Sequence, residues 1–167
     1  HDDEESHEDW IGLDGDVNGD SILNVLDVTS IVSVLLGDDS WSNECQSIYA
    51  DFNDDGLVNV IDVVSMVDII LNGLVKNNNN YATLVKFKKS NSGITFEADG
   101  YVGAIQLILT HNFDFKLDIT EDAIISDYKT TGNSTMLIIV APESNTLFTS
   151  EGFFDIENIV AASAYNY

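Results

Sequence analysis

Two stretches with nearly the same twelve residues decide how this sequence is interpreted: DVNGDSILNVLD at 16–27 and DFNDDGLVNVID at 51–62. The second copy begins 35 positions after the first. Both copies place aspartate and asparagine at the same positions, while most of the other residues differ. A repeat that keeps its oxygen-bearing side chains indicates chemistry that needs oxygen atoms at a fixed spacing.

That spacing fits calcium, which binds about six to eight oxygens; a twelve-residue loop supplies them from side chains at positions 1, 3, 5, 9 and 12 and from the carbonyl at position 7. In the first copy these positions are Asp16, Asn18, Asp20, Ile22, Asn24 and Asp27. In the second copy they are Asp51, Asn53, Asp55, Leu57, Asn59 and Asp62. Such hard oxygen ligands favour calcium over a softer metal. The sequence therefore predicts two calcium ions.

Loop positions 6 and 7 refine this prediction. Position 6 needs a sharp turn, which is usually made by glycine. Gly56 satisfies this requirement, whereas Ser21 does not, so we expect the first site to be strained or weaker. Ile22 and Leu57 supply only a backbone oxygen, so their side chains are free to enter the core. The alternative is a pair of Asp/Asn-rich turns without metal, since these residues also favour turns.

Each loop is followed by an apolar run that ends in glycine and predicts a helix: VTSIVSVLLG (28–37) and VVSMVDIILNG (63–73). The residues before Asp16 leave no room for an entering helix, so each unit is a loop followed by a helix. The segments GDVNGDSILNVLDV (15–28) and ADFNDDGLVNVIDV (50–63) resemble the dockerin family in this arrangement. The resemblance implies two calcium loops and a surface that docks to a cohesin.

The sequence departs from that family where dockerins contact their partner. Loop positions 10 and 11 are Val25-Leu26 and Val60-Ile61 rather than a Ser-Thr-like pair, and the helices are almost uncharged. A helix that is apolar on nearly every side must be covered on nearly every side. We therefore expect the second half of the chain or another protein to cover these helices. The candidate interface residues are Val25, Leu26, Ile31, Val32, Leu35, Val60, Ile61, Val64, Val67 and Ile70.

The pattern changes after KNNNN at 76–80. Short β-rich runs separated by turn residues favour an antiparallel sandwich. The predicted strands are 82–89, 94–99, 102–110, 113–119, 123–128, 135–141 and 158–165. The segments that resemble the cohesin family are VGAIQLIL (102–109), TMLIIVAP (135–142) and FFDIENIVAAS (153–163). About 85 residues is short for that family, which leaves open whether a strand is missing and an edge is free for strand addition.

Together these patterns predict an α+β chain of two modules. The first is a pair of EF-hand-like loop–helix units, and the second is a cohesin- or immunoglobulin-like antiparallel β-sandwich. The predicted division is an acidic tail at 1–12, a dockerin-like domain at 13–75, a linker at 76–81 and the sandwich at 82–167. A short additional helix is predicted from Asn43 to Tyr49.

Charge limits the partners of this chain. It carries 29 acidic residues against six lysines and no arginine, which gives a formal charge of −23 and excludes nucleic acid as a partner. Residues 1–80 hold 18 of the acidic residues and one lysine, which agrees with two functional halves. Bound divalent cations would reduce the repulsion within the first half.

The remaining chemical candidates are few. Cys45 is the single cysteine, which excludes an intrachain disulfide and favours a small buried side chain. Asn133 begins an Asn-Ser-Thr glycosylation acceptor. No set of catalytic residues is evident, so we do not expect an enzyme. The alternative is a copper site formed by His1 with His7 or His111. The simpler interpretation is that these are histidines of a tail and of a turn with no metal role.

Two functions are compatible with these features. The first is an extracellular or cell-surface calcium-binding protein that associates head-to-tail with other copies of itself into a filament or surface assembly. The alternative is an anchoring module that docks to a different cohesin-bearing protein and is associated with carbohydrate. No apolar run reaches membrane-spanning length, and the start at His1 fits a secreted protein whose signal peptide has been removed, although a trimmed chain fits as well.

Overall fold

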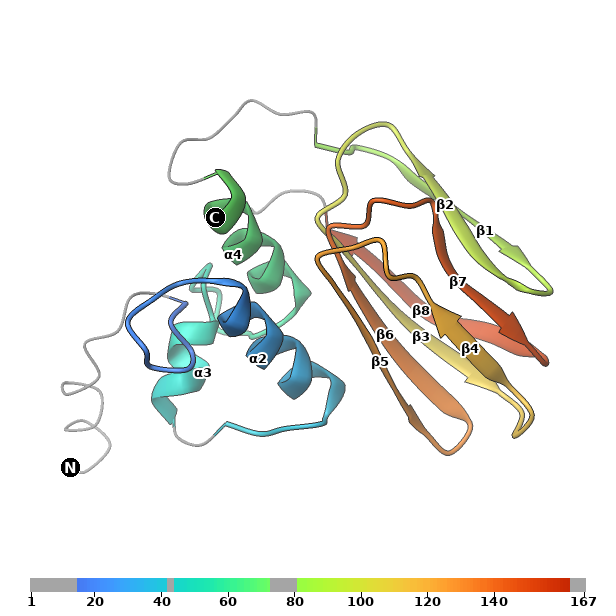
Figure 1. The fold of residues 1–167 in the computed structure, drawn as a ribbon, viewed down its shortest axis with the longest axis horizontal. Coiled ribbons are helices and arrows are strands. Elements are labelled where there is room, and N and C mark those ends of the chain that lie inside the picture. Colours follow the sequence, from blue (N-terminus) through green and yellow to red (C-terminus); the bar gives the residue numbers. More distant parts are fainter. Residues whose placement is uncertain (1–14, 42–43, 73–80, 163–167) are drawn as a thin grey trace. The chain divides into compact units, whose positions relative to one another are not determined.

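The structure is a computed structural model that describes residues 15–41, 44–72 and 81–162 (Figure 1). It divides into two compact units, whose described residues are 15–41 with 44–72 in the first and 81–162 in the second. The predicted tail at 1–12 and most of the predicted linker lie outside the described residues. Among the helices in the described part of the chain, none has the length and hydropathy needed to cross a membrane.

The described part of the N-terminal unit contains three helices: α2 (Val25–Leu36), α3 (Glu44–Ala50) and α4 (Val60–Asn72). Helices α2 and α4 contact each other, and each begins inside the last part of a repeated loop. Both therefore begin three residues before the apolar runs from which they were predicted. The difference arises because the loops themselves supply the residues that start the helices.

Helix α2 shows how local sequence sets its ends. Asn24 is the N-cap residue: its side chain accepts a hydrogen bond from the Leu26 N–H, and the Asp27 side chain accepts one from the Asn24 N–H. This reciprocal capping box satisfies donors that would otherwise lack a helical partner. The helix ends at Gly37, whose φ of 86° is left-handed, and the N–H of Asp38 reaches back to the Ser33 carbonyl.

The C-terminal unit consists of two four-stranded antiparallel sheets, as the sequence predicts for a sandwich-like architecture. The strand order is β1-β2-β7-β4 in one sheet and β5-β6-β3-β8 in the other (Figure 1). The strands are β1 (Val85–Ser90), β2 (Gly93–Ala98), β3 (Ala104–His111), β4 (Lys116–Ile119), β5 (Ile125–Thr131), β6 (Ser134–Val140), β7 (Thr146–Glu151) and β8 (Phe154–Ala162).

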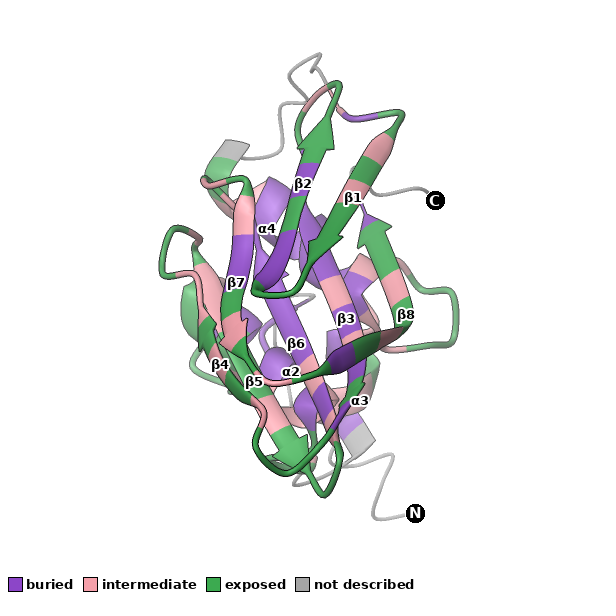
Figure 2. Cartoon of the chain, turned by 90° about the vertical axis from the view of Figure 1, so that its right-hand side faces the viewer, coloured by how far each residue is buried: buried purple, intermediate pink, exposed green. Residues whose placement is uncertain are grey.

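The core of this unit is an apolar cluster contributed by both sheets. It includes Ile94 of β2, Leu107 of β3 and Phe148 of β7, each at most 1% exposed. Figure 2 shows buried stretches, coloured purple, along β3, β6 and β7. Burying side chains of this size contributes about 1.5–3 kcal/mol each. Gly93 permits the close approach of β2 and β7, because a Cβ there would lie 2.2 Å from the Phe148 carbonyl oxygen.

Strand β7 was not predicted, although it lies in the middle of its sheet. Its sequence, TLFTSE, has only two apolar residues, and hydroxyl side chains surround them. The predicted strand at 113–119 is shorter in the structure because β4 begins at Lys116. Phe113 lies in the turn before β4 and is 94% exposed. The last strand begins earlier than predicted, at Phe154, since a register shift opposite Ile108 and Leu109 interrupts its alternation.

Candidate metal centre

The two repeated loops wind around their first aspartate. Oδ1 of Asp16 accepts hydrogen bonds from the N–H groups of Gly19 (2.9 Å) and Asp20 (3.1 Å), and its Oδ2 accepts one from Ser21 (2.8 Å). Loop bonds of this kind fold the backbone over the carboxylate.

The second loop repeats these contacts 35 residues later. Oδ1 of Asp51 accepts from the Asp55 N–H (3.1 Å), and Oδ2 accepts from the Gly56 N–H (2.9 Å). These distances agree with those in the first loop to within 0.1 Å. Two segments that differ at most other positions therefore form the same local structure around their first carboxylate.

The last aspartate of each loop closes it. Oδ1 of Asp27 accepts from the N–H groups of Val17 (2.9 Å) and Asn18 (3.3 Å), and Oδ2 accepts from Asn24 (2.9 Å). This one carboxylate therefore joins the start of the loop to the start of α2. The same side chain orders the oxygen ligands and caps the helix.

Asp62 closes the second loop in the same way. Its two oxygens accept from the N–H groups of Asn53 (3.2 Å) and Asn59 (2.8 Å). Asp62 and Asp27 are both 0% exposed. Burial raises the pKa of each carboxyl above its usual value, and the backbone hydrogen bonds only oppose this effect. Both side chains thus lie where a carboxylate is costly unless positive charge is near.

The backbone takes the left-handed conformation at positions 4 and 6 of both loops. Position 4 is Gly19 (φ 75°) and Asp54 (φ 58°), and position 6 is Ser21 (φ 69°) and Gly56 (φ 88°). A residue with a Cβ in this region costs roughly 1–2 kcal/mol. Ser21 therefore holds the backbone strain that its position in the first loop led us to expect.

The carboxylates of the second loop converge. Oxygens of Asp51, Asp55 and Asp62 all lie within 4.8 Å of one another, so the three side chains can hold a metal ion. Among the residues that the structure describes, no other group of three acidic, histidine or cysteine side chains converges in this way. Thus one group that could hold a metal ion is present in the second loop, whereas the prediction of two calcium ions stays a prediction.

The side chains at position 7 do not enter the core, and the sequence-based expectation was wrong on this point. Ile22 is 58% exposed and Leu57 is 65% exposed. The following residue turns inward in each loop: Leu23 and Val58 are half-buried. Leu23 lies so close to Gly15 that a Cβ there would be 2.9 Å from its Cδ1 atom, which explains why glycine with φ 86° precedes the first loop.

The predicted interface residues differ in exposure. Val25 and Leu26 are 41% and 58% exposed. The others are less accessible: buried residues are Ile31, Val32, Val60, Val64 and Val67, and half-buried residues are Leu35, Ile61 and Ile70. With Ile22, the exposed pair forms an apolar surface at the start of α2.

The structure also shows the surroundings of the candidate glycosylation site, the single cysteine and one of the three histidines. Asn133 is exposed in the turn between β5 and β6, as a glycosylation acceptor requires. Cys45 is buried, as the sequence predicts. His111 is 8% exposed; its Nε2 lies 2.7 Å from Thr135 Oγ1, and its Nδ1 lies 2.9 Å from the Asn112 carbonyl. Both ring nitrogens of His111 are therefore engaged, while His1 and His7 lie outside the described residues.

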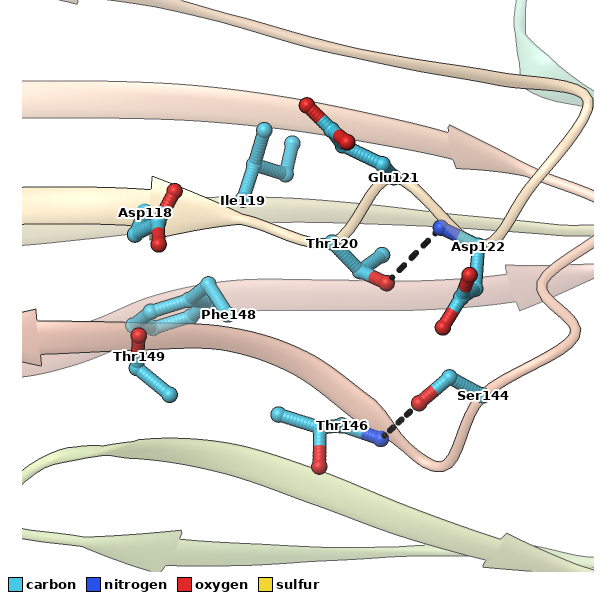
Figure 3. A pocket seen from close by; sticks show the side chains of 9 residues that line it. All are labelled: Asp118, Ile119, Thr120, Glu121, Asp122, Ser144, Thr146, Phe148 and Thr149. Atoms are coloured by element: carbon cyan, nitrogen blue, oxygen red, sulfur yellow. Dashed lines mark hydrogen bonds between the residues drawn. The ribbon is translucent and has the colours of Figure 1, made fainter.

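A hollow of about 480 Å³ lies where β4 ends beside β7 (Figure 3). Asp118, Glu121 and Asp122 line it together with hydroxyl side chains and Phe148. Its rim is held by hydrogen bonds from the Asp122 N–H to Thr120 Oγ1 and from the Thr146 N–H to Ser144 Oγ. No cationic side chain lines this hollow, so it is unsuited to an anionic ligand.

Comparison with known proteins identifies no relative: no family model, curated protein or solved structure matches this chain. Interpretation of the site therefore depends on its geometry and on the repeated sequence.

Proposed function

We propose that this chain is an extracellular calcium-binding structural protein. Its N-terminal unit is a dockerin-like pair of EF-hand-like loop–helix units that binds two calcium ions, and its C-terminal unit is a cohesin-like sandwich. In this proposal, calcium orders the loops, and the N-terminal unit of one copy binds the sandwich of the next. The observation that carries the proposal is the hydrogen-bond pattern shared by the two loops, with three converging carboxylates in the second.

Calcium is the metal that this donor set fits best. The side-chain donors are carboxylate and amide oxygens, and the position-7 residues Ile22 and Leu57 can add a backbone carbonyl. Neither loop contains histidine or cysteine. The buried carboxylates of Asp27 and Asp62 gain most from a bound cation, because a nearby positive charge offsets the cost of their burial. Metal binding would therefore stabilise the fold of this unit.

The assembly part of the proposal rests on accessible surfaces in both units. Ile22, Val25 and Leu26 are exposed beside the first loop, where calcium would set their positions. In the C-terminal unit, β1 and β8 are edge strands, each paired on one side only among the described strands. A contact between two different surfaces of identical chains is head-to-tail and propagates into rings or filaments.

The second candidate function is an anchoring module for a different cohesin-bearing protein. The same exposed residues at the start of α2 favour it, because they lie where a dockerin-like unit contacts its partner. The two candidates differ in one measurable property, since an anchoring module stays monomeric when purified alone.

The experiment that tests the proposal combines calcium titration calorimetry with light scattering on the whole chain. The expected result is two binding events, a calcium-dependent rise in thermal stability, and large particles that dissolve when a chelator is added. Asp55→Asn should weaken binding, whereas Asp54→Asn, a change in the same loop at a position that supplies no ligand, should not. Absence of calcium binding would refute the proposal; calcium binding by a chain that remains monomeric would favour the anchoring module.

A further inference from the structure

Positive charge is concentrated on a single strand of this acidic protein. Three of the six lysines, Lys86, Lys88 and Lys89, lie on β1 (Val85–Ser90), which we call the lysine strand. All three are exposed. Strand β1 is an edge strand that pairs only with β2 in the described part of the chain (Figure 1).

Local structure fixes where these lysines point. Val85 and Phe87 pack against the core cluster, so Lys86 and Lys88, which alternate with them, lie on the outer face of the sheet. Lys88 lies 3.6 Å from Glu97, and both side chains are more than 60% exposed. This is the one ion pair found among the described residues, and an exposed pair of this kind contributes about 0–1 kcal/mol. The lysine strand therefore has an excess of positive charge.

An apolar hollow adjoins the end of the lysine strand. It has a volume of about 280 Å³ and is lined by Lys89, Asn91, Gly152, Phe153 and Phe154. The Lys89 ammonium lies 4.7 Å from the centre of the Phe154 ring, and Phe153 is 60% exposed. A cation beside exposed aromatic surface suits a ligand that carries both negative charge and an aromatic ring.

The usual explanation of lysines on an edge strand is protection against aggregation. That explanation is weak here, because copies of a chain with a net charge of −23 already repel one another. Acidic residues outnumber lysines 29 to six in the chain, yet three of the six lysines lie on this one strand. The choice of lysine at three positions of one strand therefore indicates a negatively charged partner.

The first ten residues of the sequence, HDDEESHEDW, have the complementary chemistry. They carry six carboxylates and no lysine, and they end in Trp10. We infer that the lysine strand binds this segment of a second copy, with its carboxylates near Lys86, Lys88 and Lys89 and Trp10 in the hollow beside Phe153. The inference rests on the proposed head-to-tail self-association and names one of its contacts.

Two variants of the whole chain test this contact. The strand variant carries Lys86→Gln, Lys88→Gln and Lys89→Gln. The tail variant carries Asp2→Asn, Asp3→Asn, Glu4→Gln and Glu5→Gln. The control for net charge is the triple change Thr131→Asp, Asn133→Asp and Asn145→Asp, which adds three negative charges at exposed positions outside both β1 and β8. Sedimentation velocity in calcium measures self-association of each protein at low ionic strength.

We expect self-association to weaken by about tenfold or more in both variants and to change much less in the control, because the effect comes from paired charges rather than total charge. High salt, on the order of 1 M, should weaken the wild type in the same way, since it shortens the Debye length to about 3 Å. The two variants mixed together should form a one-to-one complex, because the tail of the strand variant meets an intact lysine strand. Trp10→Ala in the strand variant should weaken that complex.

Each failure has a distinct meaning. Self-association that is lost when chelator is added but is unchanged in the strand variant would overturn this inference and leave the proposed function intact. Self-association that is lost in high salt but unchanged by chelator would support the lysine-strand contact and refute calcium gating. A wild type that stays monomeric at low salt, or variants that form no complex when mixed, would overturn the contact between copies.

Discussion

Replacing Asp55 by asparagine should have opposite effects on stability without and with calcium. Asp55 is exposed, and its Oδ1 accepts a hydrogen bond from the Leu57 N–H at 2.9 Å. Asparagine keeps an acceptor oxygen for that bond. The substitution therefore removes one negative charge and replaces a carboxylate ligand by a neutral, weaker amide oxygen. It keeps the acceptor for the Leu57 N–H and loses the Oδ2 acceptor of the exposed hydrogen bond from Asn53 Nδ2.

Without calcium, the loss of charge is favourable. Asp55 lies within 4.8 Å of carboxylate oxygens of Asp51 and Asp62. At that separation two unit charges repel by about 1 kcal/mol in water, and salt near 0.15 M reduces this roughly by half. Relief from two neighbours should therefore stabilise the metal-free protein by about 1 kcal/mol.

With calcium, the loss of a charged ligand dominates, because calcium affinity depends on the number of charged ligands. An ion present at about one hundred times its Kd stabilises the fold by roughly 2.7 kcal/mol, and a hundredfold weaker Kd reduces that to about 0.4 kcal/mol. Calcium should then raise the Tm of the variant far less than that of the wild type.

Thermal unfolding followed by circular dichroism, with chelator and with a calcium series, gives both effects. Asp54→Asn is the matched control, because asparagine tolerates the left-handed backbone at that position (φ 58°) and the residue supplies no ligand. Equal responses of the two variants to calcium, or a metal-free Asp55→Asn that is clearly less stable than the wild type, would refute the reasoning.

Three further predictions concern strain, pH and packing. Ser21→Gly should raise the free energy of unfolding of the N-terminal unit by about 1 kcal/mol in urea, because it removes a Cβ from a left-handed residue. Hydrogen bonds from the Thr83 hydroxyl and from backbone N–H groups lower the pKa of Asp99. Its contribution to stability is therefore present above the unfolded pKa of about 4 and is lost as pH falls further. Asp99→Asn should reduce the dependence of the free energy of unfolding on pH in that range, measured by urea unfolding at a series of pH values. Phe148→Ala should cost about 3–5 kcal/mol because its ring is 1% exposed, whereas Phe113→Ala should change stability by less than about 0.5 kcal/mol.

The sequence predicts the loops well because their structure is local. Nearly all of the hydrogen bonds in them join residues at most ten positions apart, so a twelve-residue pattern contains most of the interactions. The exception is the Gln46 side chain, whose Nε2 donates to the Val17 carbonyl from 29 positions away. The helix starts follow from the same residues, since Asn24 and Asp27 form the capping box. The side-chain directions at position 7 were missed, because the pattern fixes which backbone oxygen is offered and does not fix the packing of the rest of the residue.

Strand pairing in the second unit depends on contacts far apart in the sequence, and prediction is weaker there. Strand β7 pairs with β2 and β4, so its place is set by residues about 30 to 55 positions earlier rather than by its own alternation. Gly93 marks this pairing, yet its importance is visible only once the Phe148 carbonyl is placed beside it. A hydroxyl-rich segment can therefore be a central strand without a periodic signal.

Burial of the closing aspartates distinguishes a metal loop from an ordinary polar turn. In an ordinary Asx turn the carboxylate lies at the surface, where one oxygen accepts a backbone hydrogen bond and water solvates the other. Asp27 and Asp62 have no exposed surface, and in the second loop two further carboxylates lie beside the buried one. Backbone N–H groups alone are weak compensation for that much negative charge, and the described residues of this unit contain no lysine or arginine. A cation at the centre of the loop would offset the repulsion and use the same oxygens, so the arrangement that is costly without metal becomes favourable with it.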